Sequence, residues 1–120
     1  MRDYTVAVNA EYAVSTNADA LECEDIAADA VENELKNKVD EIDIYIVKSY
    51  KKLFCGYIVK LSVNMVVNVE ANSYEAAYDK AVDVVNDINY KECVELVAIG
   101  TYDAALKEDK PFLMKPKFAV

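Results

Sequence analysis

Apolar and polar residues alternate along two long segments of this chain. Residues 4–16 carry tyrosine, valine or alanine at every even position up to Val14, and residues 57–70 carry apolar side chains at every odd position. A period of two predicts β-strands with one face in a core and the other toward water or a partner. Thirteen extended residues would span about 43 Å, far more than an average strand. We therefore expect these strands to bend, to bulge or to project beyond their neighbours.

Each long strand is followed by apolar residues at helical spacing. The first predicted helix has Asp19 as its N-cap, with Glu22 at the capping-box position, and the second has Ser73 as its N-cap. The apolar stripe of the first helix comprises Cys23, Ile26, Ala27, Ala30, Val31 and Leu35. The stripe of the second helix comprises Ala77, Ala81, Val84, Val85 and Ile88.

Two shorter apolar segments, residues 42–48 and 93–100, are predicted to be strands, and residues 50–52 are the expected hairpin turn. The pattern of residues 4–50 thus returns at residues 57–102, which we interpret as an internal duplication of a unit that cannot bury its apolar face alone. This element order is typical of a ferredoxin-like split β-α-β sandwich of the α+β class. Right-handed crossovers would place both helices on one face of a four-stranded antiparallel sheet, with the two long strands at its centre.

The expected domain covers residues 1–106, and a short C-terminal extension, residues 107–120, has a different composition. Lysines alternate there with Phe112, Met114 and Phe118 around two prolines. Proline removes a backbone donor, so the tail is not expected to form a regular helix. We include its three apolar side chains among the candidate partner-binding residues.

The composition narrows the class of partner and the compartment. A net charge of −9 disfavours direct binding to nucleic acid or to an anionic membrane. Three scattered cysteines indicate a reducing compartment, and each is expected to be a small buried apolar side chain. No apolar segment has the length of a membrane-spanning helix, and the N-terminus leads directly into a strand. We expect a cytoplasmic protein without a secretory signal.

The sequence offers little catalytic chemistry. Without histidine it has no Cys–His or Ser–His pair and no histidine zinc site, and two glycines leave no phosphate-binding loop. We expect neither an enzyme nor a cofactor. One alternative stays open, because the carboxylates of Asp40, Glu41 and Asp43, or of Glu92 and Glu95, could serve a small metal-dependent hydrolase.

Acidic residues occur at helical spacing on the outer side of both predicted helices. Charged helix surfaces usually serve only solvation. Between residues 3 and 35, however, the chain has nine acidic residues and no lysine or arginine, and like charges four apart mildly destabilise a helix. In a split sandwich the two rows would merge into one acidic docking surface for a basic protein. The candidate partner-binding residues on the helices are Glu22, Asp25, Asp29, Glu32, Asp79, Asp83 and Asp87.

The sheet face opposite the helices is expected to be polar and without aromatic side chains. Thr5, Asn9, Glu11, Ser62 and Asn64 fall on it by alternation. RNA-recognition domains of similar topology stack bases on aromatic side chains of that face. RNA binding of this kind is therefore not expected.

The segment from Val67 to Ala77 (Val-Asn-Val-Glu-Ala-Asn-Ser-Tyr-Glu-Ala-Ala) resembles a strand-to-helix phrase of small phage and mobile-element proteins. With its small size, its acidity and its lack of an active-site motif, the chain is similar to phage-encoded anti-defence inhibitors. Some of these block sirtuin-domain NAD-consuming bacterial defence enzymes. The resemblance implies a non-enzymatic inhibitor that binds a larger, locally basic defence protein in a bacterial cytoplasm. A structural or homo-oligomeric module that pairs through its long strands, including a homodimer, stays open as an alternative.

Overall fold

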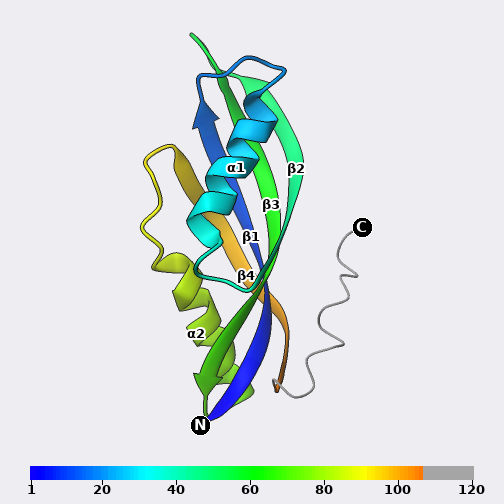
Figure 1. Cartoon of the computed structure of the whole chain (residues 1–120), viewed down its shortest axis with the longest axis vertical. Helices are drawn as coiled ribbons and strands as arrows, with labels where there is room; N and C mark the ends of the chain where they lie inside the picture. Colours follow the sequence, from blue (N-terminus) through cyan, green and yellow to red (C-terminus); the bar gives the residue numbers. More distant parts are fainter. Residues whose placement is uncertain (107–120) are drawn as a thin grey trace.

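The computed structural model describes residues 1–106, which form a four-stranded antiparallel sheet and two helices (Figure 1). The strands are β1 (Arg2–Thr16), β2 (Glu41–Lys51), β3 (Tyr57–Ala71) and β4 (Val94–Leu106), and the helices are α1 (Cys23–Leu35) and α2 (Tyr74–Asn86). The predicted α+β class is confirmed. The candidate residues Phe112, Met114 and Phe118 lie outside the described part of the chain.

The two long strands occupy the centre of the sheet, as predicted, in the order β2-β3-β1-β4. β1 and β3 pair along their whole length, from Arg2 opposite Ala71 to Thr16 opposite Tyr57. This register places the even residues of β1 and the odd residues of β3 on one face, which the helices cover. The largest fully buried side chains of this core are Tyr12, Leu35, Leu61, Met65, Val6, Val8, Val14, Val31, Val59, Val63, Val67 and Val85.

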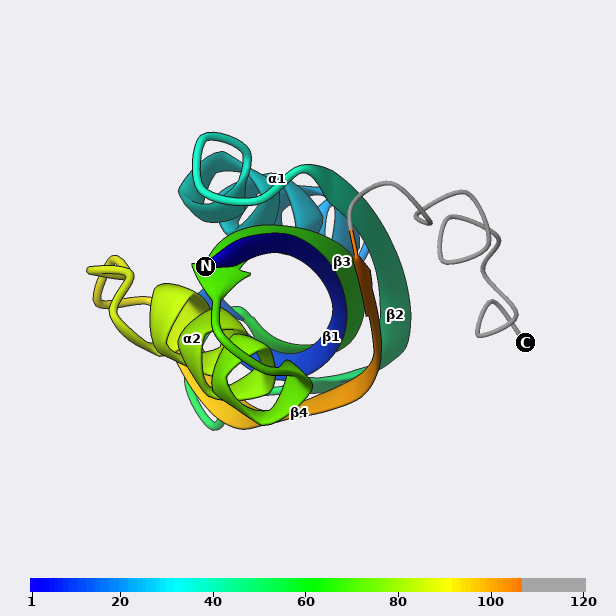
Figure 2. The ribbon, with the colours of Figure 1, turned by 90° about the horizontal axis from the view of Figure 1, so that it is seen from below.

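The length of the strands is accommodated by coiling. β1 and β3 wind together around the long axis of a molecule that measures 51 × 27 × 20 Å (Figure 2). Strand twist accumulates with length, and the bulges in the two outer strands increase it. One register shift lies in β2 between Ile46 and Lys48, and β4 has two, opposite Ala7/Val8 and Glu11/Tyr12 of β1. The strands therefore bend and bulge instead of leaving long unpaired ends.

Coiling also separates the two helices. α1 packs on β1, β2 and β3, whereas α2 packs on β1, β3 and β4. The helices lie at successive levels along the long axis and on different sides of it (Figures 1 and 2). They therefore do not form a side-by-side layer with one common outer surface.

The opposite face of the sheet is partly closed, although neither α1 nor α2 covers it. Thr5 and Ala7 on β1 are only 1% exposed, and Val66 on β3 is 6% exposed. Across this face, Asp43 of β2 lies close enough to raise the pKa of Tyr102 of β4, although burial is the larger cause. In a flat sheet the two edge strands would be about 14 Å apart. The face is concave, and its middle forms a second, smaller buried region.

Of the two predicted helix N-caps, one is confirmed and one is wrong. Ser73 caps α2 as expected, because its hydroxyl accepts the N–H of Ala76 at 3.1 Å. The prediction of Asp19 as the N-cap of α1 is wrong. The N-cap is Glu22, whose side chain makes no capping hydrogen bond. Asp19 instead accepts the N–H groups of Leu21 and Glu22, each at 3.1 Å, and so holds the turn that precedes the helix.

Several predicted boundaries and inward positions also change. The hairpin turn is not residues 50–52, because β2 continues to Lys51 and the N–H of Lys52 donates to the carbonyl of Gly56 at 3.0 Å. β4 extends to Leu106, well beyond the predicted end. Ile26 was expected in the core but is 44% exposed, since the coiled sheet meets only a narrow stripe of α1.

A pair of tyrosine hydroxyls connects the core to the loop after α2. The hydroxyls of Tyr12 and Tyr90 are 2.6 Å apart, and the hydroxyl of Tyr90 donates to the carbonyl of Val85 at 3.0 Å. Because the proton of Tyr90 is used in that bond, Tyr12 must donate to Tyr90. The two rings meet edge to face with centroids 5.4 Å apart. Because Tyr12 donates to Tyr90, and Tyr90 donates to Val85, removal of the two hydroxyls should lower the stability of the protein by different amounts.

We expect Tyr90→Phe to destabilise the protein more than Tyr12→Phe. Removing the Tyr90 hydroxyl leaves the buried Tyr12 hydroxyl without an acceptor, a loss of about 1–3 kcal/mol. Removing the Tyr12 hydroxyl leaves the bond from Tyr90 to Val85 intact, so the loss should be about 0.5–1.5 kcal/mol. Urea unfolding of both variants measures the difference, and an equal or reversed order would contradict the assigned direction of the bond.

The same pair predicts a loss of stability in alkali. Burial, together with the hydrogen bond to Tyr90, raises the pKa of Tyr12 far above the ordinary value of 10.0. In the unfolded chain Tyr12 ionises near that value, while in the folded protein it stays protonated. Its contribution is therefore complete below about pH 10 and is lost as the pH rises further. The urea midpoint of the parent should fall between pH 8 and pH 11, and the midpoint of Tyr12→Phe should fall less steeply. Identical slopes would exclude Tyr12 as a source of the effect.

Candidate functional site

The acidic residues predicted on the helices are exposed but do not share one surface. Glu22, the N-cap of α1, and the six other candidates on the helices and at their ends are all exposed. Because α1 and α2 lie at different levels and face different sides, the expected merging of the two rows is wrong (Figure 2). Each helix presents its own row.

Two acids of the row on α2 lie at the negative end of the helix dipole. Asp83 lies in the last turn of the helix and Asp87 is its C-cap, where negative charge is unfavourable by about 0.3–1 kcal/mol per group at an exposed site. No basic residue in that turn offsets it. Stability alone does not account for these two acids.

Large apolar side chains gather in two loops at one end of the molecule. Leu53 and Phe54, in the turn between β2 and β3, are 88% and 90% exposed, and Leu21, in the loop between β1 and α1, is 90% exposed. We call residues 17–22 and 52–56 the loop tip. It lies at the upper end of the molecule in Figure 1. This is the most exposed apolar group in residues 1–106.

The two loops of the tip are packed against each other. The ammonium of Lys52 donates to the hydroxyl of Ser15 at 2.9 Å and to the side-chain oxygen of Asn17 at 3.4 Å. Gly56 adopts a φ of +84°, and a Cβ there would lie 1.9 Å from the carbonyl oxygen of Thr16. A hollow of about 340 Å³ between the loops is lined by Asn17, Ala18, Asp19, Ala20, Lys51, Phe54, Cys55, Gly56 and Tyr57. The tip is therefore a braced structure rather than two independent loops.

The polar side chains of the face opposite the helices largely bind one another. The amide nitrogen of Asn9 donates to the side-chain oxygens of Asn64 at 2.8 Å and of Ser62 at 3.0 Å. The hydroxyl of Thr5 donates to Asn68 at 3.0 Å, and the amide of Asn68 donates to Asp40. These residues hold the sheet together and leave few groups for a ligand.

The expected absence of aromatic residues from this face is wrong. Tyr45 pairs opposite Ser62 and Tyr50 opposite Ile58, so both tyrosines share the face of those β3 residues. Burial raises the pKa of Tyr102 of β4, and the nearby charges of Asp103, Asp43 and Tyr45 raise it further. Tyr45 falls on this face by regular alternation with Ile44 and Ile46, whereas the bulge after Ile46 brings Tyr50 to it.

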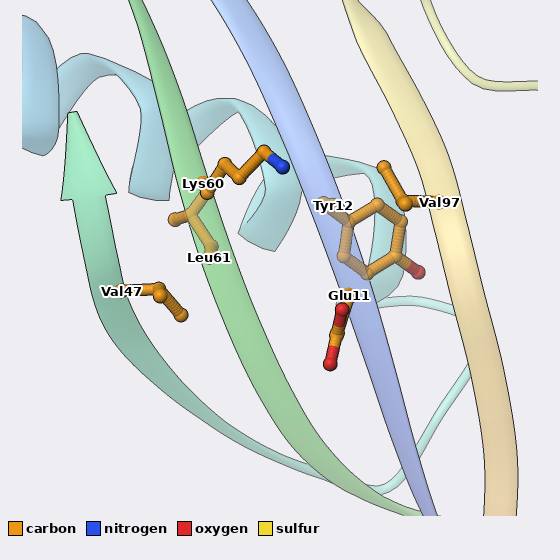
Figure 3. A pocket seen from close by; sticks show the side chains of 6 residues that line it. All are labelled: Glu11, Tyr12, Val47, Lys60, Leu61 and Val97. Atoms are coloured by element: carbon orange, nitrogen blue, oxygen red, sulfur yellow. The ribbon is translucent and has the colours of Figure 1, made fainter. Parts of the chain in front are cut away.

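One small hollow crosses the same face. Val47 of β2 and Val97 of β4 flank it, with Lys60 and Glu11 between them on the central strands (Figure 3). Its volume of about 80 Å³ is well below the roughly 300–1,000 Å³ of a site for a small-molecule ligand. The hollow does not support an active site.

The carboxylates considered for metal binding do not converge. Within residues 1–106, no group of three Cys, Asp or Glu side chains is arranged to hold a metal ion. Asp40 accepts the amide of Asn68 and so has a structural contact. The metal-dependent hydrolase gains no geometric support.

Two of the three cysteines differ from expectation. Cys23 is buried in the core, but Cys55 and Cys93 are exposed in loops. Cys55 lies in the turn that carries Leu53 and Phe54. The prediction of three buried cysteines is therefore wrong for the two that lie outside the helices and strands.

Comparison with protein-family models gives no match, and comparison with curated proteins gives no significant match. Within residues 1–106, neither helix is long and apolar enough to cross a membrane. The function is therefore inferred from the surfaces described above and from the resemblance in the sequence.

The loop tip is not among the surfaces that the sequence pattern predicts. Leu53 and Phe54 follow the predicted turn at residues 50–52 and so read as the start of the next strand. The signal that would have found them is the glycine at position 56, since a positive φ is expected of glycine at the end of a turn. Two large apolar residues inside a turn are exposed unless another segment covers them.

We expect Gly56→Ala to destabilise the protein and to disturb the loop tip. The left-handed conformation costs a non-glycine residue about 1–2 kcal/mol, and the contact with Thr16 adds to this. Gly100→Ala is the matched control, because no atom lies within 4 Å of its added Cβ. That change should remain within about 0.5 kcal/mol of the parent. Urea unfolding measures both, and similar midpoints would contradict the braced geometry of the tip.

Proposed function

We propose that this protein is a non-enzymatic protein-binding module that docks through its loop tip. The observation that carries the proposal is the joint exposure of Leu21, Leu53 and Phe54 on two loops that are braced against each other. Single exposed apolar side chains are common on protein surfaces. Three large ones at the same end of a molecule match the apolar centre of a docking surface.

Charge contributes to the choice of partner. The exposed acidic rows of α1 and α2 favour a partner with a basic surface, since complementary potentials accelerate encounter. Asp83 and Asp87 in particular are unfavourable for the helix that carries them. These acids do not stabilise the helix, but they would attract a basic partner toward the tip.

The narrower assignment comes from the resemblance of Val67–Ala77 and from the composition. On that basis the partner is a bacterial defence protein and the chain a phage-encoded inhibitor that blocks it. The fold is proposed to be the ferredoxin-like split β-α-β sandwich, which is supported by the element order and by the strand order β2-β3-β1-β4.

The proposal predicts that Phe54→Ser and Leu53→Ser each weaken binding of the partner at least tenfold. Burying either side chain in a partner is worth about 1.5–3 kcal/mol, and 1.4 kcal/mol is a factor of ten in affinity. The immobilised full chain would be used to capture a partner from lysates of bacteria that carry defence enzymes. The Kd of each variant for the purified partner is then measured, together with inhibition of that partner.

Tyr74→Ser is the matched control, because it removes a partly exposed apolar side chain at the start of α2, at the end of the β1–β3 pair opposite the tip. Its affinity should stay within about twofold of the parent. Charge reversal at Asp79, Asp83 and Asp87 should chiefly slow association, and added salt should have the same effect. Tip variants that bind the partner as tightly as the parent would refute docking through the tip.

A further inference from the structure

β2 is an edge strand with the features of a pairing surface. Its inner side pairs with β3, and within residues 1–106 no strand pairs with its outer side. Natural edge strands are usually short or interrupted, because a free edge can pair with another chain. β2 is 11 residues long, and its exposed middle contains Tyr45, Ile46 and Val47.

Charges divide β2 and its flanks into two halves. Asp40, Glu41 and Asp43 lie at its start, and Lys48 and Lys51 lie at its end. An antiparallel copy of the strand would reverse this order. The acidic half of each copy would then face the basic half of the other, which is charge complementarity of the strand with itself.

The bulge in β2 makes this complementarity geometrically consistent. Asp43 lies opposite Asn64, whereas Lys48 lies opposite Lys60, and both partners belong to the face of the sheet opposite the helices. In a regular strand Asp43 and Lys48 would point to opposite faces, because they are five residues apart. The register shift between Ile46 and Lys48 brings them to the same face.

Lys48 also lacks a favourable neighbour across the strand pair. It stands directly opposite Lys60, and like charges in such a pair are unfavourable. Its ammonium lies 5.6 Å from the centre of the Tyr50 ring, on the same face. A carboxylate arriving from the outer side of β2 would relieve the repulsion between the two lysines.

We propose that β2 pairs with β2 of a second copy of this chain, antiparallel and around a two-fold axis. Asp43 of each copy then lies opposite Lys48 of the other. The four residues between them, 44–47, face the same four residues of the second copy and form an apolar centre with charged flanks. A two-fold contact of this kind is self-complementary and closes after two chains.

The other edge strand does not fit a second copy in this way. β4 carries Glu95 and Asp103 and no cation, so its self-pairing would bring no opposite charges together. It also has two register shifts, opposite Ala7/Val8 and Glu11/Tyr12, which interrupt the edge. The two edges of the sheet therefore differ in their capacity to pair with a second copy, and β2 is the edge that pairs.

Sedimentation equilibrium of the purified full chain tests the proposal without any partner, so its outcome is independent of docking through the loop tip. The parent should approach twice the 13.4 kDa chain mass as concentration rises and dissociate on dilution. Asp43→Lys and Lys48→Asp should each raise the dimer Kd at least tenfold, because each reversal creates two like-charge contacts in the symmetric dimer. An equimolar mixture of the two variants should restore dimers, since every contact in the mixed pair again joins opposite charges.

Glu95→Lys on β4 is the control and should leave the dimer Kd within about twofold. Circular dichroism of each variant verifies the fold, and Asp43 and Lys48 are both exposed. A parent that stays monomeric up to millimolar concentration would overturn the proposal. So would variants that dimerise like the parent, a mixture that stays monomeric, or species larger than a dimer.

Discussion

The pairing of β1 with β3 over fifteen residues is the constraint on which the rest of the structure depends. A pair of this length cannot stay flat, because the twist of each residue adds to that of the one before it. The helices and the edge strands must then follow a coiled surface. The core is correspondingly long and narrow, and each helix covers only the part of the sheet at its own level (Figure 1).

Coiling also determines which surfaces are left for interaction. It turns α1 and α2 to different sides, so their acidic rows can attract a basic protein but cannot form one continuous platform. It folds the opposite face inward, where Thr5, Ala7 and Val66 become buried and the asparagines bind one another. Two surfaces of residues 1–106 then stand out, the loop tip at one end of the molecule and the outer side of β2.

These two surfaces differ in chemistry, which is why they are assigned different partners. The loop tip carries three large exposed apolar side chains on braced loops, as expected of a group that enters a pocket of another protein. The edge of β2 offers backbone groups and an order of charges that complements itself. In a dimer with antiparallel β2 strands, the two tips would point in opposite directions. Self-association and docking would then not compete for the same residues.

The sequence by itself determined the order of the strands and helices and the position of the two central strands. Alternation to Val14 and from Tyr57 identified both central strands and their inward faces, and Ser73 was recognised as the cap of α2 because its hydroxyl bond is made within one turn. Only the tertiary structure decided which residues the coiled sheet would cover. Ile26 is exposed because the coiled surface curves away from it, whereas Val66 is buried because the opposite face closes on itself. Periodicity assigns a side chain to a face, but the twist summed over two long strands decides whether that face meets water, a helix or the sheet itself.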